Sequence, residues 1–347
     1  MKAFLKALLF VLSVPAGADE TPISRIAFGS CIRQTEPMNF WGGIKASDPE
    51  LFVFLGDNVY GDTRDMKKLQ QTYEILGAET GFQQLREMAE LRAVWDDHDY
   101  GENDAGAEYP MKKASQAIFL DFWKAPEKDP RRGREGTYTA EFFGPEDQRI
   151  QLICLDTRYF RSPLVKRGFK GKDVEGSTGP YTVNADPSTT ILGEPQWTWL
   201  GEQLKHAARL RIIASSIQLI ADDHHWEKWG NFPHERERMF QLIRDSKANG
   251  IIFLSGDRHR GEISVYEEGM PYPLFDITAS SLNQGRGWRN EINRHRYGSL
   301  VFFENFGSIE VDWTSENPQL QLHLRDGRGK PVIQVTRPLS AFQPSTK

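Results

Sequence analysis

The sequence predicts a layered α/β fold. Short apolar runs bounded by turn residues alternate with longer segments of helical periodicity, which is the pattern of buried strands connected by helices. After about residue 260, short runs joined by Gly, Asn and Asp turns indicate antiparallel strands instead. The chain has 347 residues, of which 39% are hydrophobic and 26% charged. This length and composition suffice for one large core or two smaller ones.

The predicted strands and helices alternate up to about residue 260. The strands are expected at residues 23–28, 51–55, 91–95, 150–155, 210–214 and 251–254, and the helices at about 63–76, 80–90, 110–123, 194–207 and 233–248. Pro195 suits the first turn of one helix. Gly250 suits the C-cap of another.

The C-terminal part, at about 261–340, is predicted to be β-rich. Its strands are expected at residues 297–304, 308–313, 320–325 and 331–335. They would form either a second sheet of the same domain or a small β cap. A Gly-, Ser-, Thr- and Lys-rich segment at 162–193 is too long for a simple connection. It is either a loop over a site or a disordered insertion.

The N-terminus has the pattern of a secretory signal peptide. Lys2 and Lys6 precede an apolar run at 7–14, and Ala16-Gly17-Ala18 supplies small residues before a cleavage point. We therefore expect residues 1–18 to be removed and residues 19–347 to form a single domain. Because no Arg-Arg pair precedes the run, the general secretory route and a periplasmic or secreted location are predicted. No later segment is long and apolar enough to predict membrane insertion after cleavage.

The charge pattern argues against a nucleic-acid partner. The formal net charge is −5, and the signs are interspersed. Nucleic-acid binding depends on basic stripes that neutralise phosphates, and the sequence has none. A small phosphate ester held by metal ions remains compatible with this charge.

The two cysteines have different surroundings. Cys154 lies in a predicted buried strand, where it would be a small apolar side chain, whereas Cys31 follows a strand and could bind a metal as a thiolate. In an oxidising compartment a disulfide is the alternative.

Polar clusters follow four of the predicted strands directly. They are Gly29-Ser30-Cys31, Gly56-Asp57-Asn58-Val59-Tyr60, Asp96-Asp97-His98-Asp99 with Asn103 and Asp104 behind it, and Ser255-Gly256-Asp257-Arg258-His259. Ligands of open α/β sheets bind beyond the carboxyl ends of strands, so these clusters are expected to converge. Any one of them alone could be an ordinary turn.

The Asp-Asp-His-Asp cluster at 96–99 indicates a cation. Adjacent carboxylates repel one another unless a proton or a metal ion lies between them. The mixture of oxygen, nitrogen and sulfur donors suits iron, manganese or calcium better than a closed structural zinc site.

Together these stretches, with Leu155-Asp156-Thr157-Arg158, resemble the alkaline phosphatase D (PhoD-like) branch of the metallophosphoesterase superfamily. The matching motifs follow the family's order from residue 29 to residue 259. The resemblance implies an α-β-β-α sandwich and an exported phosphoesterase that hydrolyses phosphate esters with a metal-activated hydroxide. It also implies two or more metal ions, with Fe³⁺ and Ca²⁺ expected first and Mn²⁺ or Zn²⁺ as alternatives.

The resemblance assigns roles to individual residues. Asp57 would bridge two metals, and Cys31 and Tyr60 would bind a ferric ion. The remaining ligands would be Asp97, Asp257 and His259, with Asn103 as a further one. His98 would be the catalytic histidine, and Asp99 would orient it. Arg33, Arg158 and Arg258 are candidates to bind the phosphate, although Arg158 could instead pair with Asp156.

The sequence departs from the wider superfamily at the middle histidine motif, where Ser215-Ser216-Ile217-Gln218 stands. The nearby His224 and His225 either line the pocket or face solvent, and we expect solvent. The sequence leaves the choice between monoesters and diesters open. A phospholipase D-like phosphodiesterase is one alternative, and a non-catalytic calcium- or ligand-binding protein of the same fold is another.

Overall fold

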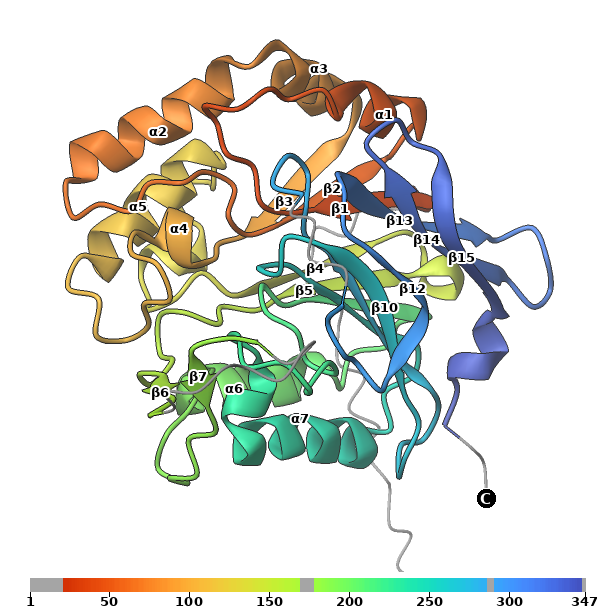
Figure 1. Cartoon of the computed structure of the whole chain (residues 1–347). Coiled ribbons are helices and arrows are strands. Elements are labelled where there is room, and N and C mark those ends of the chain that lie inside the picture. Colours follow the sequence, from red (N-terminus) through yellow and green to blue (C-terminus); the bar gives the residue numbers. More distant parts are fainter. Residues whose placement is uncertain (1–20, 169–177, 286–289, 345–347) are drawn as a thin grey trace, which may run out of the picture.

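The computed structural model describes residues 21–168, 178–285 and 290–344 (Figure 1). The predicted signal peptide lies outside these residues, as does the centre of the 162–193 segment. The described flanks of that segment pair as a short hairpin of β6 (Val165–Lys166) and β7 (Tyr181–Thr182). Within the described ranges, no helix has the length and apolarity needed to cross a membrane.

The first large sheet has six strands in the order β15-β14-β13-β1-β2-β3. Its parallel half consists of β1 (Arg25–Gly29), β2 (Leu51–Leu55) and β3 (Glu90–Val94). The other half is antiparallel and consists of β13 (Asn305–Asp312), β14 (Gln319–Asp326) and β15 (Pro331–Pro338).

The second large sheet has seven strands in the order β12-β10-β11-β9-β8-β5-β4. The central strands are parallel: β5 (Ile150–Cys154), β8 (Leu210–Ala214), β9 (Ile251–Ser255) and β11 (Leu274–Ala279). Antiparallel strands complete both edges: β4 (Thr139–Phe143), β10 (Gly261–Tyr266) and β12 (Arg296–Val301).

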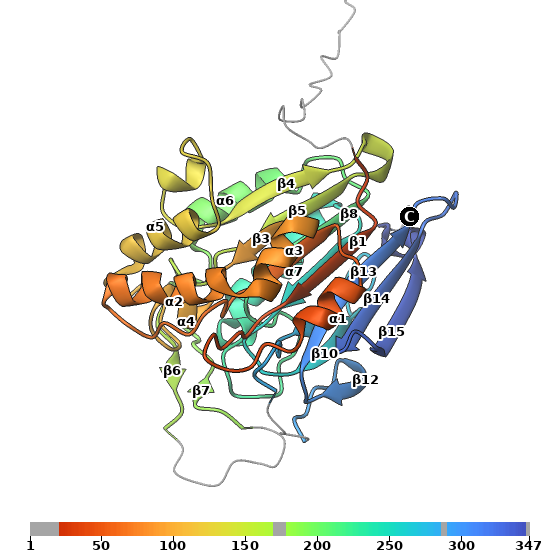
Figure 2. The same ribbon diagram turned by 90° about the horizontal axis from the view of Figure 1, so that it is seen from above.

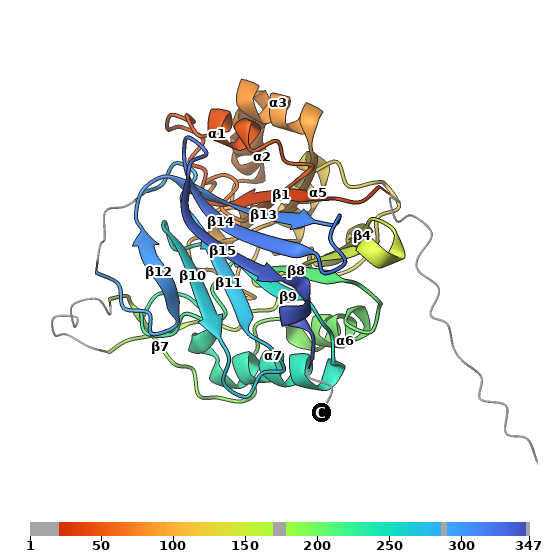
Figure 3. The same ribbon diagram turned by 90° about the vertical axis from the view of Figure 1, so that its right-hand side faces the viewer.

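The two sheets lie between layers of helices. The helices on the side of the first sheet are α1 (Trp41–Ala46), α2 (Met66–Ala78), α3 (Thr80–Met88) and α5 (Lys112–Phe122), and those on the side of the second are α6 (Gly193–Gln203) and α7 (Pro233–Ser246). Figure 1 shows this order of layers, and Figure 3 shows it from the side. In Figure 2, seen from above, α1–α3 lie over the strands of the first sheet. The predicted α-β-β-α arrangement is therefore confirmed.

Strand β2 shows how the sequence specifies these layers. Its side chains alternate between faces: Val53 and Leu55 join the core between the sheets, whereas Phe52 and Phe54 join the core beneath the helices of the first sheet. All four are fully buried. Each such side chain contributes about 1.5–3 kcal/mol of burial free energy, so β2 is fixed from both sides.

The C-terminal strands differ from one of the two expectations. They form no separate cap, because β13–β15 extend the first sheet from β1 and β12 extends the second from β10. Gly250 also does not cap α7. That helix ends with Lys247 in the left-handed conformation (φ 53°). Gly250 (φ 68°) instead lies against β8, where a Cβ atom would be 2.5 Å from the carbonyl oxygen of Arg209.

Candidate active site

The predicted polar clusters converge at the carboxyl ends of β1, β2, β3 and β9. A cavity of about 330 Å³ opens there. Its walls hold both acidic and basic side chains: Arg33, Asp57, Asp97, His98, Asn103, Asp104, Trp226, Glu227, Asp257, Arg258, His259 and Arg260. The two sheets thus bring Cys31 and His259, which lie more than 200 positions apart in the sequence, to the same site.

Three groups of potential metal ligands lie beside this cavity. Within each group the ligand atoms lie within 4.8 Å of one another. The groups are Cys31 with Asp57 and His259, Asp57 with Asp97 and His98, and Asp96 with Asp97 and Asp257. Because Asp57 and Asp97 each belong to two groups, the three form one continuous cluster.

Tyr60 joins the first of these groups. Its hydroxyl oxygen lies 2.8 Å from Nε2 of His259 and donates a hydrogen bond to Oδ2 of Asp57 at 3.3 Å. The Cys31 thiol lies 3.5 Å from the same carboxylate oxygen. A phenol, a thiol, an imidazole and a carboxylate therefore meet at one point, which we call the Tyr60 lobe (Cys31, Asp57, Tyr60 and His259).

The second half of the cluster is rich in carboxylates, and the positive charges of Arg158 and His98 only partly offset them. Burial and the neighbouring charges of Asp97 and Asp96 raise the pKa of Asp57 well above its usual value. Burial and Asp96 do the same to the pKa of Asp257. Burial raises the pKa of Asp96 to about 7 even though Arg158 opposes the shift. Such shifts mark a site that favours a bound cation.

Asp96 provides a direct test of whether this cluster fits metal ions. Its Oδ1 accepts hydrogen bonds from Arg158 Nε at 2.6 Å and Ser216 Oγ at 2.7 Å. Its Oδ2 is buried and has no hydrogen-bond partner in the part of the chain that the structure describes. A buried carboxylate oxygen without a partner is costly unless a ligand satisfies it. The donors present, mostly oxygen with nitrogen and sulfur in the Tyr60 lobe, fit hard or borderline metal ions.

The backbone at the cluster is held in an uncommon conformation. Cys31, Asp57, Asp257 and His259 have φ values of 63°, 50°, 66° and 52°. Left-handed conformations of this kind cost free energy in residues other than glycine and concentrate at functional sites. Contacts between neighbouring loops stabilise them, among them the bond from the Ile32 amide to the Asp57 carbonyl at 2.9 Å.

His98 has a different partner from the predicted one. Its Nδ1 lies 2.8 Å from Oδ1 of Asp62. Burial lowers the pKa of His98, but the charges of Asp97 and Asp62 outweigh it and raise the pKa to about 9. The imidazole is therefore protonated at neutral pH. Its ring also packs on that of Tyr60, with centroids 4.1 Å apart.

The predicted role of Asp99 in orienting His98 is thus wrong. The Asp99 carboxylate instead contacts the loop after β2 and helix α2. It accepts hydrogen bonds from Asn58 Nδ2 at 2.6 Å, Tyr73 Oη at 3.0 Å and the Asp57 amide at 3.1 Å. Asp99 therefore holds the loop after β2 in place. No feature of the sequence distinguished Asp62 from an exposed turn residue.

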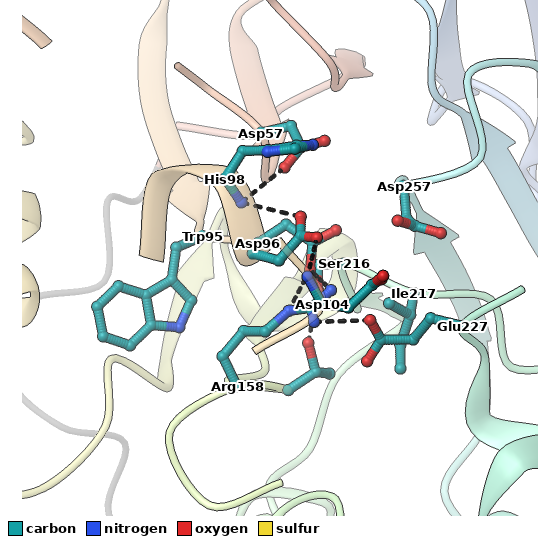
Figure 4. A network of polar contacts seen from close by, with 12 residues as sticks. Asp57, Trp95, Asp96, His98, Asp104, Arg158, Ser216, Ile217, Glu227 and Asp257 are labelled. Carbon is teal, nitrogen blue, oxygen red and sulfur yellow. Dashed lines mark hydrogen bonds and ion pairs between the residues drawn. The ribbon is translucent and has the colours of Figure 1, made fainter. Parts of the chain in front are cut away.

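Arg158 also lies where the sequence did not place it. Its side chain is fully buried between Asp96 and Glu227, with Nη1 2.7 Å from Glu227 Oε2 (Figure 4). Arg161 pairs with the other oxygen of Glu227 at 2.8 Å. Its guanidinium therefore holds the Asp96 carboxylate, and Arg158 is not among the residues that line the cavity. The alternative, a pair with Asp156, is present only through the backbone: the Asp156 carboxylate accepts the amide N–H of Arg158 at 2.9 Å, whereas the guanidinium pairs with Asp96 and Glu227.

Three other predicted residues are placed as follows. Asn103 lines the cavity, and its Nδ2 donates to Asp104 Oδ2 at 2.7 Å. His224 is buried, contrary to the expectation of solvent exposure, and its Nε2 lies 2.9 Å from Gln218 Oε1. Cys154 is buried in β5 and, like Cys31, is a free cysteine, so the disulfide alternative is excluded.

Two mixed sheets between helices, with acidic, histidine, tyrosine and cysteine side chains gathered at the strand ends, define an α/β protein with a candidate metal centre. A family model described as "PhoD-like phosphatase" matches residues 26–340. The chain therefore belongs to the PhoD-like phosphatase family, as its motifs indicated.

Individual relatives are more distant. "Alkaline phosphatase D" of Bacillus subtilis (strain 168) is 23% identical over 287 residues, which cover 71% of this chain and 48% of the relative. The chain thus spans about half the length of that protein. A solved structure described as "Structure of PhoD" superimposes with a TM-score of 0.67 at 14% identity and covers 96% of this chain and 74% of that one. This second likeness supports the fold.

Proposed function

We propose that the protein is an exported, metal-dependent phosphoesterase that acts on small phosphate esters. The observation that carries this proposal is the joining of three potential ligand groups through Asp57 and Asp97 beside one cavity. Membership of the PhoD-like phosphatase family supports the reaction class. The basic, apolar and small residues of 1–18 support export.

The cluster offers two chemically distinct places for metals. The Tyr60 lobe, with its phenol and thiol, suits Fe³⁺, and Asp96, Asp97 and Asp257 suit Ca²⁺ or Mn²⁺. Asn103 is a further candidate ligand at the cavity wall. Bound there, metal ions would neutralise phosphate oxygens and supply a water nucleophile at neutral pH.

The protein's own groups would handle the leaving alcohol. As the P–O ester bond breaks and a water oxygen bonds to phosphorus, the leaving oxygen needs a proton. The charges of Asp97 and Asp62 raise the pKa of His98 to about 9, which favours its protonated form, and its Nδ1 lies 2.8 Å from Asp62 Oδ1. Its Nε2 can therefore donate that proton. Stacking on Tyr60 fixes the plane of the ring.

The experiment that tests the proposal combines metal analysis with turnover. Purified protein is expected to contain metal and to hydrolyse an aryl phosphate ester. Asp57→Asn should lose bound metal and activity together, because Asp57 belongs to two ligand groups. Asp147→Asn, at an exposed position, is the matched control and should change neither. Full turnover by Asp57→Asn would overturn the proposal.

A further inference from the structure

One wall of the cavity is basic and lies next to the carboxylate cluster. Arg258 and Arg260 follow Asp257 along the loop between β9 and β10, and both line the cavity. Their exposures are only 6% and 5%. Long basic side chains are seldom buried to this extent without matching negative partners.

The two arginines share a single carboxylate. Glu291 Oε2 accepts a hydrogen bond from Arg258 Nη2 at 2.7 Å, and Glu291 Oε1 lies 2.9 Å from Arg260 Nη1. The Nε of Arg260 donates to the carbonyl oxygen of Arg258 at 3.0 Å. One carboxylate thus serves two guanidinium groups. The second carboxylate beside Arg258, that of Asp257, belongs to the ligand cluster, where a bound metal ion would take up its charge.

Two neighbouring groups contribute little to the charge of this wall. Burial, and then the charges of Arg258 and Lys228, lower the pKa of His224 well below its usual value. The neutral form of His224 is therefore favoured, and this residue adds no positive charge to the wall. Another nearby carboxylate, Glu262, is already bound by Arg296 at 2.7 Å.

Within this wall, Arg258 has N–H groups that the described residues do not use as hydrogen-bond donors. Among the described residues its Nη1 makes no hydrogen bond, and Asp257 Oδ2 lies 4.0 Å from it. Its Nε is buried and likewise has no hydrogen-bond partner within the described ranges. The guanidinium lies over the ring of Trp226 at 5.4 Å, which limits its movement. Glu291, Arg260 and Trp226 therefore hold Arg258 in one orientation beside Asp257.

We propose that Arg258 binds the third non-bridging oxygen of a phosphate monoester dianion and so makes the site selective for monoesters over diesters. This inference rests on the proposed phosphoesterase function. A monoester carries three non-bridging oxygens and two charges, whereas a diester carries two such oxygens and one charge. With two oxygens directed to the metal cluster, only the monoester has a charged oxygen left for Arg258, and charge-assisted bonds of this kind are the strong ones.

The test compares kcat/KM for an aryl phosphate monoester with that for an aryl methyl phosphodiester. We expect Arg258→Gln in the metal-loaded protein to lower the value for the monoester by roughly 10–100-fold, the usual range for a lost hydrogen bond to a charged group. The value for the diester should fall by less than about threefold. Arg258→Lys keeps the positive charge and serves as the control for misfolding. It should lower the ratio of the monoester kcat/KM to the diester kcat/KM less than Arg258→Gln does. Arg337→Gln, an exposed arginine on β15, should leave the ratio unchanged.

A binding measurement separates this inference from the proposed function. Calorimetry with inorganic phosphate and with dimethyl phosphate needs no turnover. Arg258→Gln should weaken the binding of phosphate about 10-fold or more while leaving that of dimethyl phosphate nearly unchanged. Equal losses for both ligands, or an unchanged kcat/KM ratio in an active enzyme, would refute the role of Arg258 and leave the phosphoesterase proposal standing. A metal-loaded wild-type protein that hydrolyses neither ester would refute the phosphoesterase proposal instead.

Discussion

The Nδ1 atom of His98 lies 2.8 Å from Oδ1 of Asp62, so a turn residue after β2 holds the imidazole that follows β3. The two come from different loops, and the contact closes one side of the cavity. It also contributes to the raised pKa of His98. A pair of this kind acts as a unit in proton transfer.

Replacing Asp62 should therefore alter the pH dependence of turnover. In Asp62→Asn the pKa of His98 should fall, because a negative charge that raised it is lost. The donor form of His98 is present below its pKa, so the alkaline limb of the kcat profile should move to lower pH. The profile of metal-loaded protein checks this, with Asp147→Asn as the matched control. An unmoved alkaline limb with full metal content would show that Asp62 does not act through His98.

The Tyr60 lobe leads to a spectroscopic prediction. Burial and the charges of Cys31 and Asp57 raise the pKa of Tyr60 well above its usual value, so a phenolate forms there only beside a cation. If Fe³⁺ occupies the lobe, the protein should be coloured, and Tyr60→Phe should lose the phenolate-to-iron absorption. Iron content and the visible spectrum are measured together. A colourless protein with calcium alone would favour the non-catalytic binding alternative, and an unchanged spectrum in Tyr60→Phe would exclude Tyr60 as a ligand.

The carboxylate cluster should make the metal-free protein less stable as pH rises. The pKa of Asp96 is raised to about 7 and that of Asp99, through burial, to about 6. The folded state thus binds more protons than the unfolded state, whose carboxyls titrate near pH 4. Between about pH 4 and pH 7 the free energy of unfolding should fall, by about 4 kcal/mol at most for Asp96 alone. His98, with its pKa raised to about 9, adds to the loss above pH 6.5.

Melting temperatures of chelator-treated protein at pH 5 and pH 8 check this prediction. The value at pH 8 should be the lower one, and adding metal should raise it more at pH 8 than at pH 5, because metal ions bind the deprotonated carboxylates. Asp57→Asn, which removes one of the repelling charges, should reduce the pH dependence. A metal-free protein equally stable at both pH values would contradict the electrostatic account.

Arg158 should matter for stability through the charges that it neutralises. Arg158→Met leaves the buried carboxylates of Asp96 and Glu227 without their shared partner. Removing one member of a buried ion pair typically costs 3–5 kcal/mol, so we expect a loss of about 3–5 kcal/mol in denaturant unfolding. Arg337→Met, at an exposed site, should cost less than about 0.5 kcal/mol. A loss below about 1 kcal/mol in Arg158→Met would show that the pair is not needed by the fold.

The sequence predicted the parts of this site that follow strands directly. Asp57, Asp97 and Asp257 each lie within three residues of a strand end, so the alternation of strands and helices was enough to bring them together. The antiparallel additions to each sheet were less clear, because β10 and β11 lie in a stretch that carried no distinct helical or strand boundary in the prediction.

The missed residues depend on contacts through space. Glu227 and Asp62 reach their partners from loops whose paths no local pattern fixes. The error at Asp99 arose because it is adjacent to His98 in sequence. On the short helix α4 (Asp97–Tyr100), successive side chains point in different directions. Arg158 was misplaced because its partner, Asp96, is 62 positions away in the sequence, and no local pattern connects the two.

The left-handed backbone at Cys31, Asp57, Asp257 and His259 limits how this centre can change. Asp, Asn and His enter that conformation more readily than most residues, and β-branched side chains scarcely enter it at all. Exchange of one metal for another by mutation is therefore confined to a short list of donors. Within that list, an Asp-to-Asn change removes a negative charge and leaves the backbone conformation unchanged. The loops can therefore lose their metal ligands while they keep their shape.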